Sequence, residues 1–329
     1  MSTRPFNVFK NVSRFDEAAD IIENEFSSLT LDQQYRNAFA RLLKQDPLDR
    51  VQMLGTDQRD LFTPVLGNLI SESMTEPGHL IDFGGGDGQT FHLVADNVPS
   101  QSRVSIVEPN EKYLDQYRTY LENHSQLQLG SSLASGLEGI FNSSGEVKVN
   151  GFDKACVGLA IHMIYFLSDL EGSLKTMYRC LRKGGVLFIV FAEEQEAYTG
   201  HMARLFYERA GRKKDRDTLE EKVAQRMELF GEGGRAKKLL QQVCPDDEVH
   251  MESYVQKSRL YGHSLADMIA FCNIAELAGV EGLEKFGVAR EALQEKSSLV
   301  DLRIEESSDA RHGMLSVAQP QRVVVIRKI

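Results

Sequence analysis

Apolar residues recur at helical spacing through the first part of the chain, and residues 12–76 are predicted to be largely helical. Thr30 is placed to cap a second helix, on which Tyr35 and Phe39 lie one turn apart. Asp46-Pro47 should end that helix, because a residue before proline avoids the α region. The first helix has an apolar face made of Phe15, Ala18, Ile21, Ile22 and Phe26.

From His79 onward the pattern changes, and short apolar runs alternate with helical stretches. Strands are expected at 80–83, 104–107, 152–159, 186–192, 249–260 and 323–326, and helices at 90–98, 111–123, 169–181 and 264–278. The run at 186–192 is continuously apolar, as in a strand covered on both faces, and Lys183-Gly184-Gly185 is expected to form the turn before it. This alternation predicts an α/β fold with a doubly wound, Rossmann-like sheet.

Composition narrows the class of protein. The 329 residues hold 38 Lys and Arg against 48 Asp and Glu, so the formal net charge is −10. A net-acidic chain disfavours general nucleic-acid binding, and no apolar run is long enough to span a membrane. Residues 1–11 lack the apolar segment of a secretory signal. The four cysteines form no C-x-x-C pair, so we expect reduced thiols, no metal site and a cytoplasmic location.

The strongest motif is Asp82-Phe83-Gly84-Gly85-Gly86-Asp87-Gly88, which follows an apolar strand and precedes a helix. A dinucleotide fingerprint needs a further glycine, and the two positions that would hold it are Gln89 and Phe91. The motif also lacks the lysine of a P-loop. Its spacing favours a tight turn at which the amino-acid and ribose parts of a cofactor approach bare backbone.

Glu108 ends the next predicted strand, 20 residues after Gly88. A carboxylate at that position is suited to accept two hydrogen bonds from a ribose diol. The glycine turn, its place between strand and helix, and this acid together predict a cofactor site.

These residues resemble class I S-adenosylmethionine-dependent methyltransferases over about residues 78–195. The resemblance implies S-adenosylmethionine as the cofactor. Asp82 and the glycines at 84, 85, 86 and 88 would surround its methionine part, and Glu108 would hold its ribose. Ser131 or Ser132, after the third strand region, would lie near the adenine. The backbone from Leu159 to Ile161 would contact the cofactor from the other side.

A narrower resemblance extends to the histamine N-methyltransferase group of small-molecule methyltransferases. It rests on Val107-Glu108-Pro109 with the following Tyr117 helix, on 161–169, on 313–328, and on Tyr35 with Phe39. In that group the aromatic pair belongs to a wall over the substrate. The chain departs from the group at Leu48, where the group has an acid, and at His162, where it has a glutamine. Gln319 stands in place of an asparagine, so the resemblance implies a small-molecule pocket without identifying histamine.

His162 follows the fourth predicted strand, at the edge where open α/β sheets bind ligands. Two interpretations stay open: a general base or hydrogen-bond partner for the methyl acceptor, or a histidine that only lines the pocket. His79, His124 and His250 are expected at the surface.

Several aromatic residues are suited to enclose a cationic acceptor, although plain core packing is the alternative for each. Glu193, after the fifth strand, could receive an ammonium group or simply end a strand. The candidate substrate-binding residues are Tyr35, Phe39, Tyr165, Phe166, Glu193, Tyr198 and Gln319.

The expected organisation has four parts: a helical N-terminal lid (1–76), a cofactor-binding core (77–195), an inserted substrate cap (196–265), and a C-terminal part that completes sheet and pocket (266–329). The predicted activity is methyl transfer to a small molecule, with an amine or imidazole-like nitrogen as the favoured acceptor. An O-methyltransferase with His162 as base, and a cofactor-binding protein without catalysis, are the alternatives.

Overall fold

A computed structural model describes most of the chain. The described residues are 3–5, 12–42, 44–45, 51–52, 54–140, 149–274, 277, 279–295, 300–306 and 310–329. They form two compact units, each assembled from three separate segments. Unit 1 comprises 1–58, 192–224 and 256–321, and unit 2 comprises 59–191, 225–255 and 322–329. Asp46-Pro47 and Leu48 lie outside the described residues. The expected four-part division stays a prediction.

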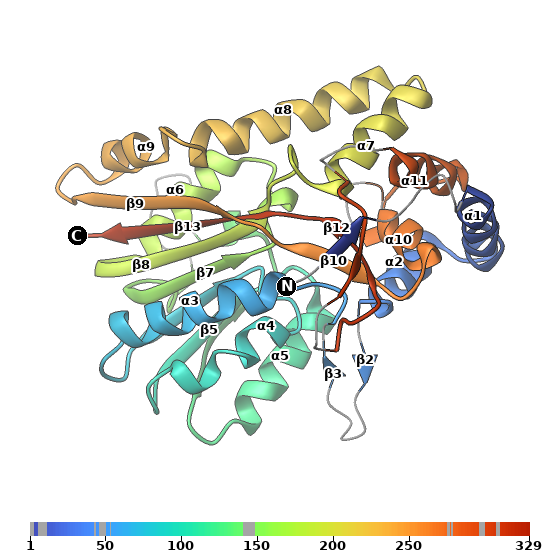
Figure 1. Ribbon diagram of the computed structural model, residues 1–329. Coiled ribbons are helices and arrows are strands. Elements are labelled where there is room, and N and C mark those ends of the chain that lie inside the picture. Colours follow the sequence, from blue (N-terminus) through green and yellow to red (C-terminus); the bar gives the residue numbers. More distant parts are fainter. Residues whose placement is uncertain are drawn as a thin grey trace. The chain divides into compact units, whose positions relative to one another are not determined.

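Unit 2 is built on a seven-stranded sheet, which confirms the predicted doubly wound α/β fold (Figure 1). The strand order is β6-β5-β4-β7-β8-β13-β9, and the pairs β6/β5, β5/β4, β4/β7 and β7/β8 are parallel. The strands are β4 (His79–Phe83), β5 (Arg103–Val107), β6 (Gln128–Leu133), β7 (Ala155–Ile161), β8 (Leu181–Ala192), β9 (Val249–Gln256) and β13 (Gln321–Lys328).

Alternate residues of one strand pack against different helices. Val186, Phe188 and Val190 of β8 join the core formed with α3, α4 and α5. Leu187 and Ile189 join the opposite core, which contains residues of α6 and α9. Because successive strand side chains point to opposite faces, both faces of the sheet are buried, as its continuous apolar runs predict. The helices are α3 (Gln58–Ser73), α4 (Gln89–His92), α5 (Glu111–Asn123), α6 (Leu170–Cys180) and α9 (Ala236–Val243).

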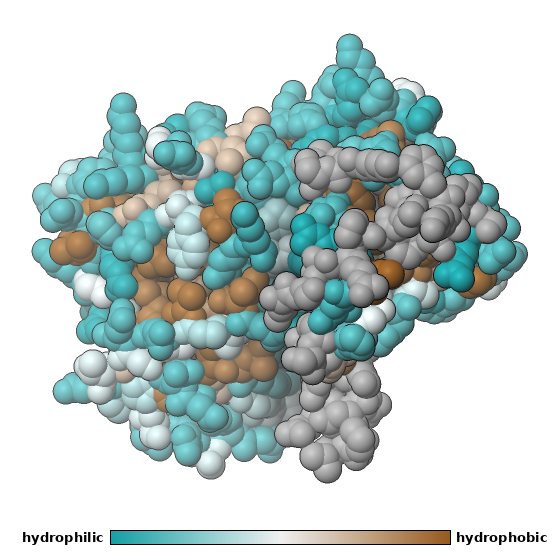
Figure 2. All heavy atoms as spheres, viewed as in Figure 1, coloured by the Kyte–Doolittle hydropathy of each residue, from teal (hydrophilic) through white to brown (hydrophobic). Residues whose placement is uncertain are grey.

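Short 3₁₀ segments complete unit 2 at η2 (Ala95–Asn97), η3 (Leu137–Gly139) and η4 (Ile164–Phe166). Figure 2 shows apolar side chains gathered in the middle of this face of unit 2, with mostly polar side chains around them. Among the described residues, no helix combines the length and the apolar character needed to cross a membrane.

Unit 1 combines helices with a four-stranded sheet of order β1-β11-β12-β10 and a two-stranded sheet, β2-β3. Its helical elements are α1 (Val12–Phe26), α2 (Leu31–Ala40), α7 (Tyr198–Arg209), α10 (Leu265–Ala270), η5 (Phe271–Ile274) and α11 (Glu284–Gln294). Its strands are β1 (Thr3–Pro5), β2 (Lys44–Gln45), β3 (Val51–Gln52), β10 (Arg259–Gly262), β11 (Arg303–Glu305) and β12 (Leu315–Ala318). Helix α8 (Lys213–Phe230) has residues in both units.

Capping hydrogen bonds set the starts of two predicted helices, α2 and α5. Thr30 caps α2 with a reciprocal pair of hydrogen bonds to Gln33, and Asn110 accepts hydrogen bonds from the backbone of Lys112 and Tyr113 at the start of α5. The helix expected at 90–98 is shorter, because α4 ends at His92 and η2 follows. Val98 is extended, as a residue before proline prefers.

Three predictions of local structure are wrong. The segment 183–185 is not a turn before a strand, because it lies within β8, which begins at Leu181. The pairing of β8 with β7 shifts in register at this segment. The strand expected at 249–260 is two strands, β9 and β10, in different sheets. His79 is buried rather than at the surface: its ring nitrogens lie 3.0 Å from the Asp153 carbonyl oxygen and 2.8 Å from Ser105 Oγ.

Candidate functional site

The glycine turn joins β4 to α4 at the carboxyl edge of the parallel strands. Gly84, Gly86 and Gly88 have φ values of +68°, +57° and +83°, which side chains other than hydrogen rarely allow. The Gly84 amide donates to the Val107 carbonyl at 2.7 Å, so the turn is anchored to β5. A Cβ at Gly86 would meet no described atom within 4 Å. The turn therefore offers open space beside bare backbone, which fits the close approach of a cofactor.

Glu108 lies directly after β5 and is largely buried, with 9% of its surface exposed. Its Oε2 accepts a hydrogen bond from the Gly86 amide at 3.0 Å, and its Oε1 accepts one from the Asn110 amide at 2.8 Å. Each carboxylate oxygen has a second lone pair. The two backbone donors thus fix the carboxylate beside the turn and leave it able to accept hydrogen bonds from a diol.

Asp82 is buried near the end of β4, and its Oδ2 accepts a hydrogen bond from the Tyr117 hydroxyl at 3.0 Å. Burial and, to a smaller extent, the charge of Glu108 raise the pKa of Asp82 to about 7 against the opposing effect of the Tyr117 hydrogen bond. The same burial raises the pKa of Tyr117, so Tyr117 remains the donor. Asp82, the predicted acid of the motif, thus lies under the glycine turn and changes its charge near neutral pH.

The predicted adenine and backbone contacts lie on the neighbouring strands. Ser131 and Ser132 lie within β6, not after it, and the Ser131 hydroxyl donates to the Asn150 carbonyl at 2.8 Å. Leu159 pairs with Asp82 across β7 and β4, and its side chain is fully buried. Ile161 is the last residue of β7. Their roles toward a cofactor stay predictions.

His162 follows β7 with a φ of +52°, in a region that a residue with a Cβ seldom adopts. Its amide donates to the Val190 carbonyl at 2.7 Å, and its Nδ1 lies 3.2 Å from the Tyr165 hydroxyl oxygen. If Tyr165 donates, neutral His162 carries its proton on Nε2 and acts as a donor there. If Nδ1 donates, Nε2 carries no proton and is suited to act as a base. The Tyr165 hydrogen bond therefore sets whether Nε2 is a donor or a base, while the role of His162 toward a methyl acceptor stays a prediction.

Tyr165 and Phe166 lie beside His162 in η4. The Arg226 guanidinium carbon lies 5.4 Å from the Tyr165 ring centroid, so that ring already has a cation over it. Phe166 meets Tyr165 edge-on at 6.2 Å and is 85% exposed. Phe166 is thus a single exposed ring close in sequence to His162, and its role toward a substrate stays a prediction.

The other predicted substrate residues belong to unit 1. The rings of Tyr35 and Phe39 are stacked at 6.0 Å. The Glu193 amide donates to the Pro320 carbonyl at 2.8 Å, and the Gln319 Nε2 donates to the Thr199 hydroxyl at 2.8 Å. Unit 1 thus brings Glu193, Gln319 and the start of α7 together.

Tyr198 is buried in α7, and its hydroxyl donates to the Met268 carbonyl at 3.2 Å. Its side chain is therefore packed in the core of unit 1. This is the alternative that the sequence left open for each aromatic residue.

Two residues at the cofactor edge were not among the predicted site residues. Arg59, in the first turn of α3, is partly buried; burial lowers its pKa, and the charges of Asp87 and Asp60 oppose that shift. Tyr117 bonds Asp82, as described above. Arg59 has no fixed spacing to the glycine motif, and the only sequence signal for Tyr117 is the family resemblance of its helix.

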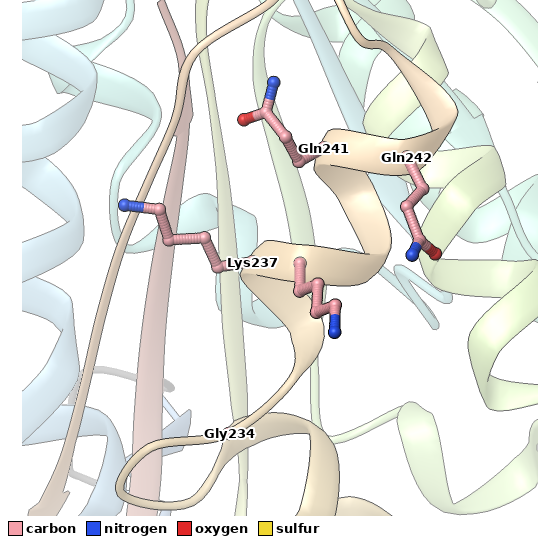
Figure 3. Close-up of a pocket in the computed structure, with 5 residues that line it drawn as sticks. Gly234, Lys237, Gln241 and Gln242 are labelled. Carbon is pink, nitrogen blue, oxygen red and sulfur yellow. The ribbon is translucent and has the colours of Figure 1, made fainter.

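A separate hollow of about 480 Å³ runs along α9 and is lined by Gly234, Lys237, Lys238, Gln241 and Gln242. Figure 3 shows Lys237 and Gln242 directed to opposite sides of the helix, so their polar groups do not converge. This hollow is not the candidate site. The part of the chain that the structure describes holds no cluster of three or more His, Cys, Asp or Glu suited to a metal ion.

Comparison with known proteins finds similarity to methyltransferases. Residues 53–208 match the model of the ubiE/COQ5 methyltransferase family. Comparison with curated protein sequences gave no match.

Similar solved structures include a putative methyltransferase (BH2331) from Bacillus halodurans C-125, 14% identical, covering 80% of this chain and 97% of that one, with a TM-score of 0.47. The YcgJ protein from Bacillus subtilis is 10% identical, covers 80% and 98%, and has a TM-score of 0.48. The plantazolicin methyltransferase BpumL, in complex with a triazolic desmethylPZN analog and SAH, is 10% identical, covers 97% and 99%, and has a TM-score of 0.44.

The family match spans just under half of the chain and contains the glycine turn, Glu108 and His162. It agrees with the sheet and the turn described above and supports S-adenosylmethionine as the cofactor. The fold of unit 2 is the Rossmann-like fold of S-adenosylmethionine-dependent methyltransferases.

Proposed function

We propose that the chain is an S-adenosylmethionine-dependent methyltransferase that acts on a small molecule, with a nitrogen of an amine or imidazole-like compound as the acceptor. The observation that carries the proposal is the buried Glu108 carboxylate, which is held by the Gly86 and Asn110 amides beside an open glycine turn. A carboxylate fixed in this way is suited to the ribose hydroxyls of a nucleoside cofactor.

In this proposal the bound cofactor supplies a methyl group on a sulfonium, which is already a good leaving group. The protein then has to hold the acceptor in line with that methyl and exclude water. Gly84, Gly86 and Gly88 let the cofactor approach the backbone, and Glu108 orients its ribose. An acceptor amine must be neutral when it attacks, so a nearby hydrogen-bond acceptor that takes up the released proton assists the reaction.

Support for a nitrogen acceptor comes from the aromatic residues and from the resemblance to the histamine N-methyltransferase group. Tyr35 and Phe39 form a stacked pair, and Phe166 offers an exposed ring. Ring faces bind cationic and imidazole-like groups well. In this proposal Glu193 receives an ammonium group of the substrate other than the nitrogen that is methylated, and Gln319 orients the substrate through a hydrogen bond.

Calorimetric titration with S-adenosylmethionine and S-adenosylhomocysteine tests the cofactor half of the proposal. We expect wild type to bind both, and Glu108→Gln to bind at least tenfold more weakly, a change of about 1.4 kcal/mol. Glu111→Gln is the matched control, because Glu111 is an exposed glutamate three residues away. Absence of binding by folded wild-type protein would contradict the proposed function.

Methyl-labelled S-adenosylmethionine then tests the acceptor. We expect label on members of a panel of small amines and imidazoles and none on matched phenols and alcohols. Label only on hydroxyl acceptors would replace the nitrogen assignment by an O-methyltransferase. Tight cofactor binding without transfer to any member of a broad panel would favour a cofactor-binding protein without catalysis.

The O-methyltransferase alternative rests on His162, whose Nδ1 lies against the Tyr165 hydroxyl at the ligand edge of the sheet. A hydroxyl acceptor needs a base with a pKa near neutrality, and histidine is the usual one. Under this alternative, His162→Ala removes most activity at pH 7 and flattens the rise of rate with pH. Full activity of the variant across pH would exclude His162 as the base.

A further inference from the structure

The ring of Tyr117 forms the floor of the glycine turn. Tyr117 lies in α5 and is completely buried. A Cβ built at Gly85 would lie 2.7 Å from its Cε1, and one at Gly88 would lie 2.6 Å from its Cδ2. Phe91 packs against the same ring with centroids 5.7 Å apart. Two glycines of the turn therefore lack side chains because the Tyr117 ring occupies that space.

The hydroxyl of this ring reaches the acid at the end of β4. Tyr117 Oη donates to Asp82 Oδ2 at 3.0 Å, and that same carboxylate oxygen lies 2.9 Å from the Cβ position of Gly85. Among the described residues, the ionisable groups that act on Asp82 are Tyr117 from α5 and Glu108 from the end of β5. The Tyr117 hydroxyl thus holds the Asp82 carboxylate beneath the glycine turn, and the negative charge of Glu108 repels it.

Asp82 is well placed to change charge near neutral pH. Burial and the Glu108 charge raise its pKa to about 7, while the Tyr117 hydrogen bond opposes that shift. A cofactor with an ammonium group, and a sulfonium in its methylated form, brings positive charge to the turn. Positive charge favours the ionised form of a nearby carboxylate. By linkage, raising the pH through the titration of Asp82 then strengthens cofactor binding.

We propose that Tyr117 is a positioning residue of the cofactor site, which holds the Asp82 carboxylate under the glycine turn and so couples cofactor affinity to pH through the charge of Asp82. This inference rests on the proposed function, because it needs a nucleoside cofactor that brings an ammonium group to the turn. Tyr117 itself touches the protein side of the turn and acts through Asp82.

Calorimetric titration with S-adenosylhomocysteine between pH 6 and 9 tests the inference. We expect wild-type affinity to rise several-fold across this range, with a midpoint near neutrality. Tyr117→Phe loses the donor that favours the carboxylate, so its midpoint should move to higher pH and its affinity at pH 7 should fall about two- to threefold. Tyr113→Phe removes a hydroxyl from an exposed tyrosine of the same helix and should follow the wild-type curve.

Asp82→Asn keeps the size of the side chain but cannot ionise. This variant should bind S-adenosylhomocysteine weakly, and its affinity should lack the dependence on pH that comes from position 82. Circular dichroism establishes that each variant is folded; if Tyr117→Phe does not fold, the comparison of wild type with Asp82→Asn decides. A flat wild-type profile, or an Asp82→Asn profile with the wild-type slope, would overturn the inference while leaving the proposed function intact. Failure of wild type to bind at any pH would instead overturn the proposed function itself.

Discussion

The Glu108 carboxylate accepts a hydrogen bond from the Gly86 amide at 3.0 Å, although the two residues lie on different strand ends. This bond joins the carboxyl end of β5 to the turn that follows β4. The orientation of the acid is therefore coupled to the turn, and disturbing the backbone of Gly86 should disturb the orientation of Glu108. Two glycine substitutions separate backbone strain at this point from a general effect of adding a methyl group.

Gly86→Ala should destabilise the protein by about 1–2 kcal/mol, because alanine is strained at a φ of +57° even though the added methyl meets open space. Cofactor affinity should fall with it. Gly287→Ala, in α11, adds a methyl that also meets open space but at a helical position, and should stabilise by about 0.5–1 kcal/mol. Urea unfolding measures both changes. Equal effects of the two substitutions would contradict the role assigned to the turn.

Arg59→Gln should weaken cofactor binding about tenfold while changing stability little. A partly buried guanidinium at the start of α3, with Asp87 of the glycine turn among the charges that act on it, is suited to the carboxylate of an amino-acid ligand. Arg118→Gln, on α5, is the control, because its ion pair with Asp115 lies at the surface. Calorimetry at low and at moderate salt checks the prediction. Equal affinity for the Arg59 variant and wild type would remove Arg59 from the site.

His79 should make the protein sensitive to acid. Burial lowers its pKa to about 4 from an ordinary value near 6.5, so the unfolded chain takes up this proton first as pH falls. The stabilisation that neutral His79 gives the folded state is present above pH 6.5 and is lost as the pH falls from about 6.5 to 4. We expect a loss of about 1–2 kcal/mol between pH 7.5 and 5, measured by urea unfolding and absent in His79→Gln. His250→Gln replaces an exposed histidine and is the control. A difference in unfolding free energy between wild type and His79→Gln that stays the same at pH 7.5 and pH 5 would reject this assignment.

The features that the sequence predicted well are those set by neighbouring residues. The β4 strand, the glycine turn, the α5 helix and the position of Glu108 all depend on short patterns within the α/β alternation. The capping of α2 by Thr30 is equally local. Such features are encoded by side-chain periodicity and by hydrogen bonds within a few residues, so one sequence is enough to place them.

The features that the sequence missed depend on contacts between distant segments. His79 is buried because Ser105 and Asp153 surround it, 26 and 74 residues later. The Lys183–Gly185 segment belongs to β8 because β7 pairs with it across a register shift. Arg59 and Asp87 interact through the packing of α3 near the turn. No periodic pattern carries these relationships, because they follow from the fold and not from local spacing.

Phe166 offers a test of acceptor binding that folding does not confound. Its side chain is 85% exposed, so Phe166→Ala should change stability by less than about 0.5 kcal/mol. If Phe166 packs against the acceptor, the variant should raise the KM for the acceptor several-fold and leave the affinity for S-adenosylhomocysteine unchanged. Leu93→Ala removes another exposed apolar side chain, which lies just after α4, and should alter neither quantity. Steady-state kinetics with the acceptor found in the label-transfer screen gives the comparison. An unchanged KM in Phe166→Ala would place the acceptor away from η4, and a changed cofactor affinity would mean that Phe166 belongs to the cofactor half of the site.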